Sequence, residues 1–517
     1  MAIKAITSLA RAALASLRRG WKMLAPFLQH LLMSLGIGII AAIILHVARP
    51  YVPGLAGAET AATDWAIKFW EDRLDTVHPG DDRFVFIDID EPTYRAWKDP
   101  LFAPREKLLP LIQFVLDAQA KLLVVDIELT KYAPRPTSPP STPHPGIEPD
   151  NPDDALAAYL RRYSERFASA QKPMAIVPTP IILARTIRSR LRSGPSEPGQ
   201  ADGVRTDAIR EERSSEFLEP IVAGSSVLHW GSPLSDRDDD GLVRNWRLLE
   251  ATCLKDEPHA VPSMALLSWV LLRAPLLNSA SSTPAAFKEE LRRRFAPSRA
   301  TCGPSSTPEA LPVAASVSPW TLVDRVLGKP LVLSTKPSDL EQRIFYKFHP
   351  GTVLAGQFSR VSAKLITDSA PDQPVSRDWI RDAIVVIGSS YETGKDLHLT
   401  PIGEMPGALV VINQINALLE FGQFQELSRG IRWTGLLLLI AIFSLVFSFF
   451  TKAWGAQVST FVINAILLPL SLWLFQYGWW LDLVFPLFVL QAYQKFVDLK
   501  VTPSPMIRRH GETHEHQ

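Results

Sequence analysis

The sequence lacks an excess of charge of either sign. Its 54 Lys and Arg residues nearly balance its 53 Asp and Glu residues, so the formal net charge is +1 over 517 residues. A protein that binds nucleic acid through its phosphates needs a positive field, which this composition does not supply. We therefore expect no nucleic acid among the partners of this protein.

Cysteine is nearly absent as well, because the chain contains only Cys253 and Cys302. In an oxidising compartment the two thiols can form a disulfide. Closing a loop of about 50 residues in this way would stabilise the fold by about 4 kcal/mol. The sequence does not say whether the two Cα atoms lie within bonding range, so the bonded and the free state both remain open.

Charged residues are missing from three long stretches near the ends of the chain, which are residues 23–48, 433–451 and 453–481. About 20 consecutive apolar residues are enough to cross a bilayer as a helix. The stretches therefore predict transmembrane helices at 25–47, 433–451 and 456–477. A weaker fourth candidate at 479–496 contains Asp482 and Lys495. Four spans fit the basic tail better, and three remain open.

The flanks of the first stretch predict its orientation. Residues 1–24 are basic without any acidic residue, which places this leader in the cytoplasm, either as an amphipathic helix on the inner surface or as a merely positive segment. A cleaved signal peptide is the rival interpretation, but the apolar run exceeds the usual 7–15 residues. Residues 48–430 would then lie outside and residues 497–517 would form a short cytoplasmic tail. We expect a multi-pass protein of the bacterial inner membrane, with the lipid bilayer as a partner.

The exterior segment alternates between strand-like and helix-like patterns. Residues 83–90, 121–128 and 383–388 are short runs rich in Val, Ile and Phe, which favour buried strands. Residues 104–120 and 406–420 are typical of helices. Strands joined by a helix indicate a parallel sheet, here assembled from both ends of the segment. The predicted fold class is thus an α/β extracytoplasmic domain, with a mixed or parallel sheet flanked by helices, plus a transmembrane helical bundle of four spans. Turn-rich residues 133–153, 192–204 and 278–318 are expected to be surface insertions.

Two of the predicted strands end in paired acids, Asp88 with Asp90 and Asp126 with Glu128. If the strands are adjacent, up to four carboxylates gather at the carboxyl edge of the sheet, where open α/β sheets bind ligands. Such a cluster could bind a divalent cation or an amine. Alternatively, the four acids cap helices or accept loop N–H groups. No nucleophile or activating base is evident beside them, so we expect no enzyme activity, no cofactor and no assigned metal ligands.

The turn that follows residues 383–388 resembles a phosphate-binding loop but departs from it twice. Its spacing is Gly-x5-Gly-Lys, and Asp396 stands where a Ser or Thr would hold Mg²⁺. A turn that binds some other anion through backbone N–H groups remains open. Ser389, Ser390, Asp396 and His398 are therefore ligand-binding candidates. Asp238-Asp239-Asp240-Gly241 resembles half of a calcium loop, yet the later bidentate Glu is missing, which favours an acidic turn.

An ordered series of segments resembles a known family. The segments are FVFIDIDEPTYRAW (84–97), the Pro-Arg start and helix at 104–120, LLVVDIE (122–128), DDDGLVRNWRL (238–248), VPSMALLSWVLL (261–272), IFYKFHPG (344–351) and residues 383–419. They resemble the type-2 CHASE domain, an extracytoplasmic sensory domain of bacterial signalling receptors. The resemblance covers about residues 65–425. It implies structural roles for Arg105, Asp240, Gly241, Arg244, Pro401, Pro406 and Gly407.

The resemblance implies a sensory role. We expect a non-enzymatic sensor or receptor subunit that binds an unknown extracytoplasmic ligand or partner. The family usually carries a cytoplasmic output domain after its last span, whereas only residues 497–517 follow here. The signal would then pass through the transmembrane bundle to a separate cytoplasmic or membrane protein, and the chain could form a homo-oligomer. The alternative is a scaffold or anchoring subunit of an envelope complex.

Overall fold

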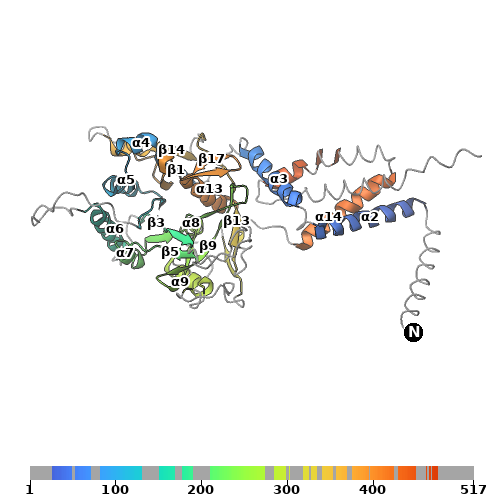
Figure 1. Cartoon of the computed structure of the whole chain (residues 1–517), viewed down its shortest axis with the longest axis horizontal. Coiled ribbons are helices and arrows are strands. Elements are labelled where there is room, and N and C mark those ends of the chain that lie inside the picture. The colour runs from blue at the N-terminus through green and yellow to red at the C-terminus, as the bar shows by residue number, and fades with distance from the viewer. Residues whose placement is uncertain are drawn as a thin grey trace, which may run out of the picture. The chain divides into compact units, whose positions relative to one another are not determined.

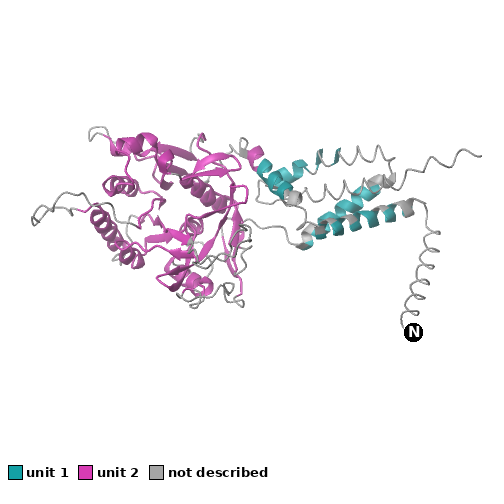
Figure 2. Cartoon of the chain, viewed as in Figure 1, with its two compact units in different colours: residues 1–66, 425–517 teal, residues 67–424 magenta. Residues whose placement is uncertain are grey.

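The computed structural model of the 517-residue chain describes most of its central part. The described residues are 26–48, 53–71, 82–130, 151–168, 177–189, 210–273, 284–297, 302, 318–324, 328–334, 340–352, 357–369, 375–394, 396–423, 429–449, 461–462, 465–466 and 468–475. The chain divides into two compact units (Figure 2). Unit 1 combines residues 1–66 with residues 425–517, and unit 2 comprises residues 67–424.

A six-stranded parallel sheet forms the centre of unit 2. In spatial order its strands are β14 (Phe358–Ser362), β1 (Phe84–Ile89), β15 (Ile384–Ser389), β2 (Leu122–Val125), β3 (Ile181–Ala184) and β6 (Leu228–Gly231). β1 and β2 are buried along their whole length, as expected for parallel strands covered on both faces. The sheet is assembled from both ends of the unit, because β15 lies between β1 and β2.

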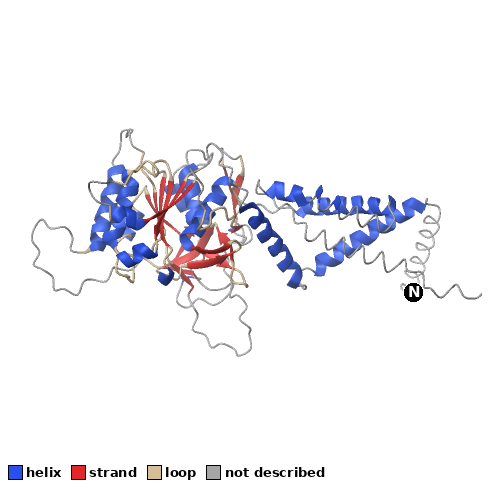
Figure 3. Ribbon diagram, turned by 90° about the horizontal axis from the view of Figure 1, so that it is seen from above, coloured by secondary structure: helices blue, strands red, loops and turns tan. Residues whose placement is uncertain are grey.

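Helices cover both faces of this sheet, so unit 2 has three layers (Figure 3). One face packs on α5 (Arg105–Asp117), α6 (Pro152–Ala168), α7 (Glu219–Ala223) and α12 (Ala363–Thr367), whose apolar residues share one core with alternate strand residues. The other face packs on α8 (Met264–Arg273) and α13 (Gly407–Glu420). Gly388 allows α13 to lie close to β15, since a Cβ atom there would clash with Ala408. The predicted α/β layering of this part of the chain is confirmed.

Smaller elements surround the three layers (Figure 1). A four-stranded sheet has the order β10 (Glu257–Pro262), β9 (Leu249–Leu254), β5 (Arg210–Glu212) and β4 (Ile187–Ser189). A three-stranded sheet has the order β13 (Glu341–Arg343), β8 (Val243–Arg247) and β7 (Ser235–Arg237). Two hairpins are β11 (Trp320–Val323) with β12 (Pro330–Leu333), and β16 (Leu397–Thr400) with β17 (Gly403–Pro406). The remaining helices of unit 2 are α4 (Glu91–Ala96), α9 (Pro284–Phe295) and the 3₁₀ turn η3 (Glu392–Gly394), while α3 (Pro53–Glu71) begins in unit 1.

The predicted transmembrane bundle is wrong for the described part of the chain. No helix among the described residues is both long and apolar enough to cross a membrane. The first two uncharged stretches form α2 (Pro26–Ala48) and α14 (Arg429–Phe449), which bury Ala42, Leu436 and Ile440 against each other. Hydropathy does not distinguish apolar residues that pack helix against helix from residues that face lipid.

The third uncharged stretch contains α16 (Leu468–Phe475), a helix of 8 residues. The other described residues of the predicted span at 456–477 are 461–462 and 465–466. The predicted leader at 1–24, the predicted span at 479–496 and the predicted tail at 497–517 lie outside the described residues.

Candidate functional site

A pocket of about 410 Å³ opens at the carboxyl edge of the parallel sheet. Its walls come from the segments that follow β1, β2, β3 and β15, together with the segment that leads into β7. The lining residues are Ile89, Tyr94, Trp97, Pro100, Leu101, Phe102, Ala103, Asp126, Ile127, Glu128, Ala184, Arg185, Thr186, Ile187, Pro233, Leu234, Ser389, Tyr391, Gly394 and Asp396. Open α/β sheets bind ligands at this edge.

One wall of the pocket is aromatic. The rings of Tyr94 and Tyr391 are stacked, with centroids 4.1 Å apart and planes 5° from parallel. Trp97 beside them is 8% exposed, and its indole N–H has no acceptor among the described residues. Asp90 caps α4, because its carboxylate accepts the N–H of Thr93 at 3.0 Å. This helix carries Tyr94 and is followed directly by Trp97, so the Asp90 cap helps to position both rings.

Two carboxylates of the pocket wall interact with each other. Burial, together with the neighbouring Asp396, raises the pKa of Asp126 to about 8. The Asp126 carboxylate has no hydrogen bond or ion pair within the described part of the chain. Asp396 contacts the Nε2 atom of His398 at 3.1 Å. At neutral pH the pair therefore holds a proton that a bound cation could replace.

The cation of the pocket wall is already neutralised. The Arg185 guanidinium donates to Glu212 at 2.6 Å and to the two oxygens of Glu219 at 2.7 and 3.2 Å. It also lies over the ring of Trp230, 4.9 Å from the centroid. Arg185 is 1% exposed and balanced by two carboxylates, so it holds the wall together and offers little to an anion.

Among the acids predicted to cluster, the structure separates those of β1 from those of β2. β15 lies between the two strands, and Asp88 lies on the sheet face opposite to Ile87 and Ile89. There it accepts hydrogen bonds from Arg360 at 2.7 Å and from Ser390 at 2.8 Å. Its second oxygen is buried without a partner among the described residues, and burial raises its pKa.

The remaining ligand-binding candidates fall into two groups. Asp126, Glu128, Ser389 and Asp396 line the pocket, and His398 contacts it through Asp396. Glu128 is already engaged, because it accepts a hydrogen bond from Thr130 at 2.8 Å and lies 3.7 Å from the guanidinium of Arg213. Asp90, Asp88 and Ser390 are used in capping and ion pairing outside the pocket. Within the described residues, no group of three or more His, Cys, Asp or Glu side chains is arranged to hold a metal ion.

Comparison with protein families assigns most of the chain. The family model described as the CHASE2 domain matches residues 38–449. The chain belongs to the CHASE2 family. Comparisons with curated proteins and with solved structures gave no match. CHASE2 domains are extracytoplasmic sensory domains, so this chain carries a domain of that class, as the resemblance of its motifs predicted.

The CHASE2 motif residue Arg105 lies behind the pocket wall and holds two of its segments in place. It is 1% exposed and paired with Asp153 at 3.2 Å. Its other guanidinium nitrogens donate to the backbone carbonyls of Ala103 at 2.9 Å and of Glu128 at 3.3 Å. Ala103 and Glu128 both line the pocket. One buried arginine therefore ties together the walls that follow β1 and β2.

The other motif residues shape turns. Arg244 binds Asp238 at 2.7 Å and Asp240 at 2.6 Å, and its hydrogen bond lowers the pKa of Asp240 to about 2. Gly241 has φ of +82°, a conformation that favours glycine. Pro401 lies in the turn between β16 and β17, and Pro406 precedes α13. Gly407 starts α13 directly beside the Asp396 carboxylate, where a Cβ atom would come within 2.6 Å of its oxygens.

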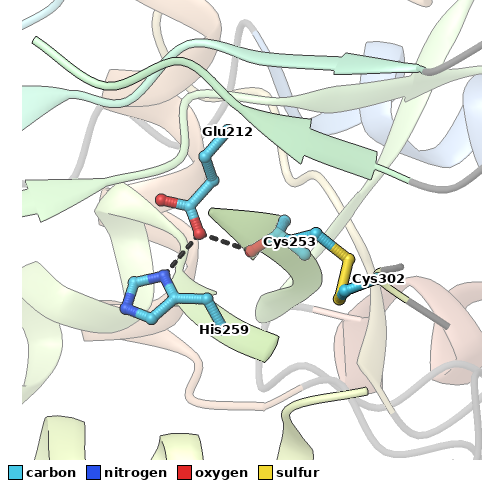
Figure 4. The surroundings of a disulfide bond; sticks show 5 residues. Glu212, Cys253, His259 and Cys302 are labelled. Atoms are coloured by element: carbon cyan, nitrogen blue, oxygen red, sulfur yellow. Dashed lines mark hydrogen bonds and ion pairs between the residues drawn. A yellow bond between two sulfur atoms is a disulfide. The ribbon is translucent and has the colours of Figure 1, made fainter. Parts of the chain in front are cut away.

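Cys253 of β9 and Cys302 form a disulfide, with Cα atoms 5.6 Å apart (Figure 4). Beside it, Glu212 contacts His259 and also accepts a hydrogen bond from Thr252 at 2.5 Å. Burial acts to raise the pKa of Glu212, but His259, Arg185 and Thr252 outweigh it and lower that pKa. The disulfide therefore lies next to the ionic network that neutralises Arg185 in the pocket wall.

Sequence reasoning did not single out Tyr94, Trp97, Tyr391 or Arg185. Two of the aromatic residues, Tyr94 and Trp97, belong to the segment FVFIDIDEPTYRAW, five and eight residues past the end of β1. Aromatic residues directly after the carboxyl end of a buried strand were therefore the available signal. Nothing local distinguishes Arg185, because its partners Glu212 and Glu219 are 27 and 34 residues away in the chain.

Proposed function

We propose that this CHASE2 protein is a non-enzymatic sensor that binds a small molecule in the sheet-edge pocket and passes the signal to a separate protein. The observation that carries the proposal is the pocket itself. Its volume of about 410 Å³ is within the roughly 300–1,000 Å³ of small-molecule sites. The walls of the pocket are aromatic and carboxylate. No histidine is among the described lining residues, and His398, which contacts the wall residue Asp396, is also held by Arg237, which supports binding without catalysis.

The pocket connects to a long helix of the same unit. The backbone carbonyl of Asp396 accepts the N–H of Gly407, the first residue of α13, at 2.9 Å. α13 is buried from Gly407 to Leu419, so it can move only together with the elements packed on it. It is also the last described helix of unit 2 before the chain enters unit 1. A ligand that moves Asp396 would therefore move the start of α13.

Signalling by this route requires two arrangements of the protein that bind the ligand with different affinity. Pro233 and Leu234, on the pocket wall, lead into β7, and Arg237 at the end of β7 lies 3.3 Å from His398. The pocket wall is thus linked to both the three-stranded sheet and the β16–β17 hairpin. A ligand that fits one spacing of these walls better than another would shift the population between them.

The test is a thermal-shift screen of chemically diverse small molecules with the purified full chain. Leu234→Trp would fill the pocket, whereas Leu365→Trp makes the same exchange at an exposed position of α12. Compounds that stabilise the wild type and the Leu365→Trp variant should not stabilise the Leu234→Trp variant. Such a compound should also change the amount of partner protein that co-purifies with the chain. A stoichiometric complex that ignores every bound compound would instead support the scaffold alternative.

A further inference from the structure

We infer that the ligand of this pocket is a small organic cation with an aromatic or apolar body, whose ammonium or guanidinium group lies between Asp126 and Asp396. This inference rests on the proposed function, because it names the chemical class of ligand for the same pocket. It is carried by three features of the wall, which are its charge balance, its unpaired carboxylate and its stacked rings.

The charge balance of the pocket favours a cation. The charged side chains on the described wall are Asp126, Glu128, Asp396 and Arg185. Arg185 is balanced by Glu212 and Glu219, and Glu128 is paired with Arg213. Asp126 is left without a cationic partner among the described residues, and its neighbour Asp396 contacts the imidazole of His398. An anion would meet these two carboxylates without a free donor of positive charge.

The Asp126 carboxylate has no hydrogen-bonded or ionic partner among the described residues, and a cationic ligand could be that partner. Burial together with Asp396 raises its pKa to about 8. Asp126 is half-buried, and with this raised pKa it keeps its proton at neutral pH, because ionisation would leave a poorly solvated charge beside Asp396. An ammonium group placed between the two carboxylates would replace that proton and donate to both.

The stacked tyrosines suit the aromatic or apolar body of such a ligand. Tyr94 and Tyr391 present a rigid aromatic wall, and Trp97 extends it. Aromatic faces attract cations and flat apolar groups. A divalent metal ion is a poorer fit, because the described residues offer no set of three or more His, Cys, Asp or Glu ligands. The wall therefore suits an organic cation better than an anion or a metal ion.

The experiment compares three probes of similar shape and different charge. Isothermal titration calorimetry of the full chain at pH 7.5 would use phenethylamine, 2-phenylethanol and 3-phenylpropionate. We expect phenethylamine, which is a cation at this pH, to bind at least tenfold more tightly than the neutral or the anionic probe. Asp126→Asn should remove at least a factor of ten of that preference. Asp117→Asn, a matched change at an exposed carboxylate at the end of α5, should leave it intact.

Proton release gives a second readout that a merely structural role of Asp126 would not produce. The groups that face this carboxylate and can change charge are Asp396, Glu128, His398 through Asp396, and the two tyrosines. Phenethylamine affinity should rise about tenfold per unit between pH 6 and 7.5, because the Asp126 proton must leave. Calorimetry in two buffers of different ionisation enthalpy should detect about one proton released. Both effects should persist in His398→Asn and disappear in Asp126→Asn.

The outcomes separate this inference from the proposed function. Equal binding of 2-phenylethanol, or tighter binding of 3-phenylpropionate, would overturn the cation inference. If Leu234→Trp abolished that binding, the pocket would still be the sensory site. Absence of binding by all three probes would also overturn the inference, and the compounds found in the thermal-shift screen would then decide the proposed function independently.

Discussion

His229 of β6 and Lys288 of α9 form a buried contact between two basic side chains. The Nδ1 atom of His229 lies 3.1 Å from the Lys288 ammonium, and His229 is 1% exposed. Burial, together with the neighbouring Lys288 charge, lowers the pKa of His229 to about 3. Burial also lowers the pKa of Lys288. The imidazole must therefore be neutral in the folded protein, where its Nδ1 atom accepts a hydrogen bond from the ammonium group of Lys288.

This contact predicts that the protein loses stability in mild acid. The pKa of His229 is lower in the folded state than its usual 6.5, so its contribution is complete above pH 6.5 and is lost as the pH falls towards 3. Thermal unfolding of the full chain should show a midpoint that falls between pH 7 and 4. The fall should be smaller in His229→Gln, whereas His349→Gln, a half-buried control, should follow the wild type. An equal fall in all three proteins would exclude His229 as the cause.

Asp126 predicts the opposite dependence on pH. The pKa of this acid is raised from 3.8 to about 8 on folding, so its contribution is complete below pH 3.8 and is lost as the pH rises towards 8. Asp126→Asn should therefore increase the free energy of unfolding, and the increase should grow from pH 5 to pH 8 by up to about 1.4 kcal/mol per unit. Urea unfolding without ligand measures this difference. A constant difference across that range would show that Asp126 is ionised in the folded protein.

At the scale of elements, the disulfide joins β9 to Cys302, 49 residues further along the chain. The intervening segment includes β10, α8 and α9, so the bond restrains much of the unfolded chain in this region. Cys253→Ser with Cys302→Ser should lower the free energy of unfolding by about 2–4 kcal/mol. Urea unfolding with and without a reducing agent measures the effect. The reductant should weaken the wild type and leave the double variant unchanged.

The helix α13 is joined to the preceding segment by one buried amide. The Oδ1 atom of Asn413 accepts the N–H groups of Lys347 and Phe348 at 2.8 and 2.9 Å, and its Nδ2 donates to the carbonyl of Phe348 at 2.8 Å. Asn413→Ala should cost about 3 kcal/mol or more, because two buried N–H groups lose their acceptor. Asn416→Ala removes the same side chain from the same helix, where it makes one bond to Glu420, and should cost less. Chemical unfolding of both variants checks the order.

At the scale of the whole molecule, unit 2 depends on both of its ends. β15 (384–389) pairs with β1 on one side and with β2 on the other. Without β15 and α13 the edges of β1 and β2 would be unpaired and one face of the sheet would lose its helix. A fragment of residues 67–380 should therefore not unfold cooperatively, whereas residues 67–424 should. Circular dichroism during thermal unfolding distinguishes the two, and a cooperative transition in the shorter fragment would contradict this dependence.

Local patterns predicted much of this architecture. The runs at 83–90, 121–128 and 383–388 correspond to β1, β2 and β15, and those at 104–120 and 406–420 correspond to α5 and α13. The three strands and α13 are buried along almost their whole length, and α5 is buried along one face, so their apolar patterns indicate them. The same kind of signal misled us for the uncharged stretches at the chain ends, because apolar composition does not say what an apolar residue contacts.

The sequence by itself determined the family, the α/β class of the exterior domain and the acids at the ends of its strands, since each of these depends on residue type and short spacing. Only the tertiary structure decided which acids meet. By inserting β15 between β1 and β2, it leaves Asp88 with Arg360 and brings Asp126 near Asp396. The rings of Tyr94 and Tyr391, about 300 residues apart in the chain, stack for the same reason. Strand pairing is a long-range choice, governed by the packing of the whole sheet rather than by any one segment.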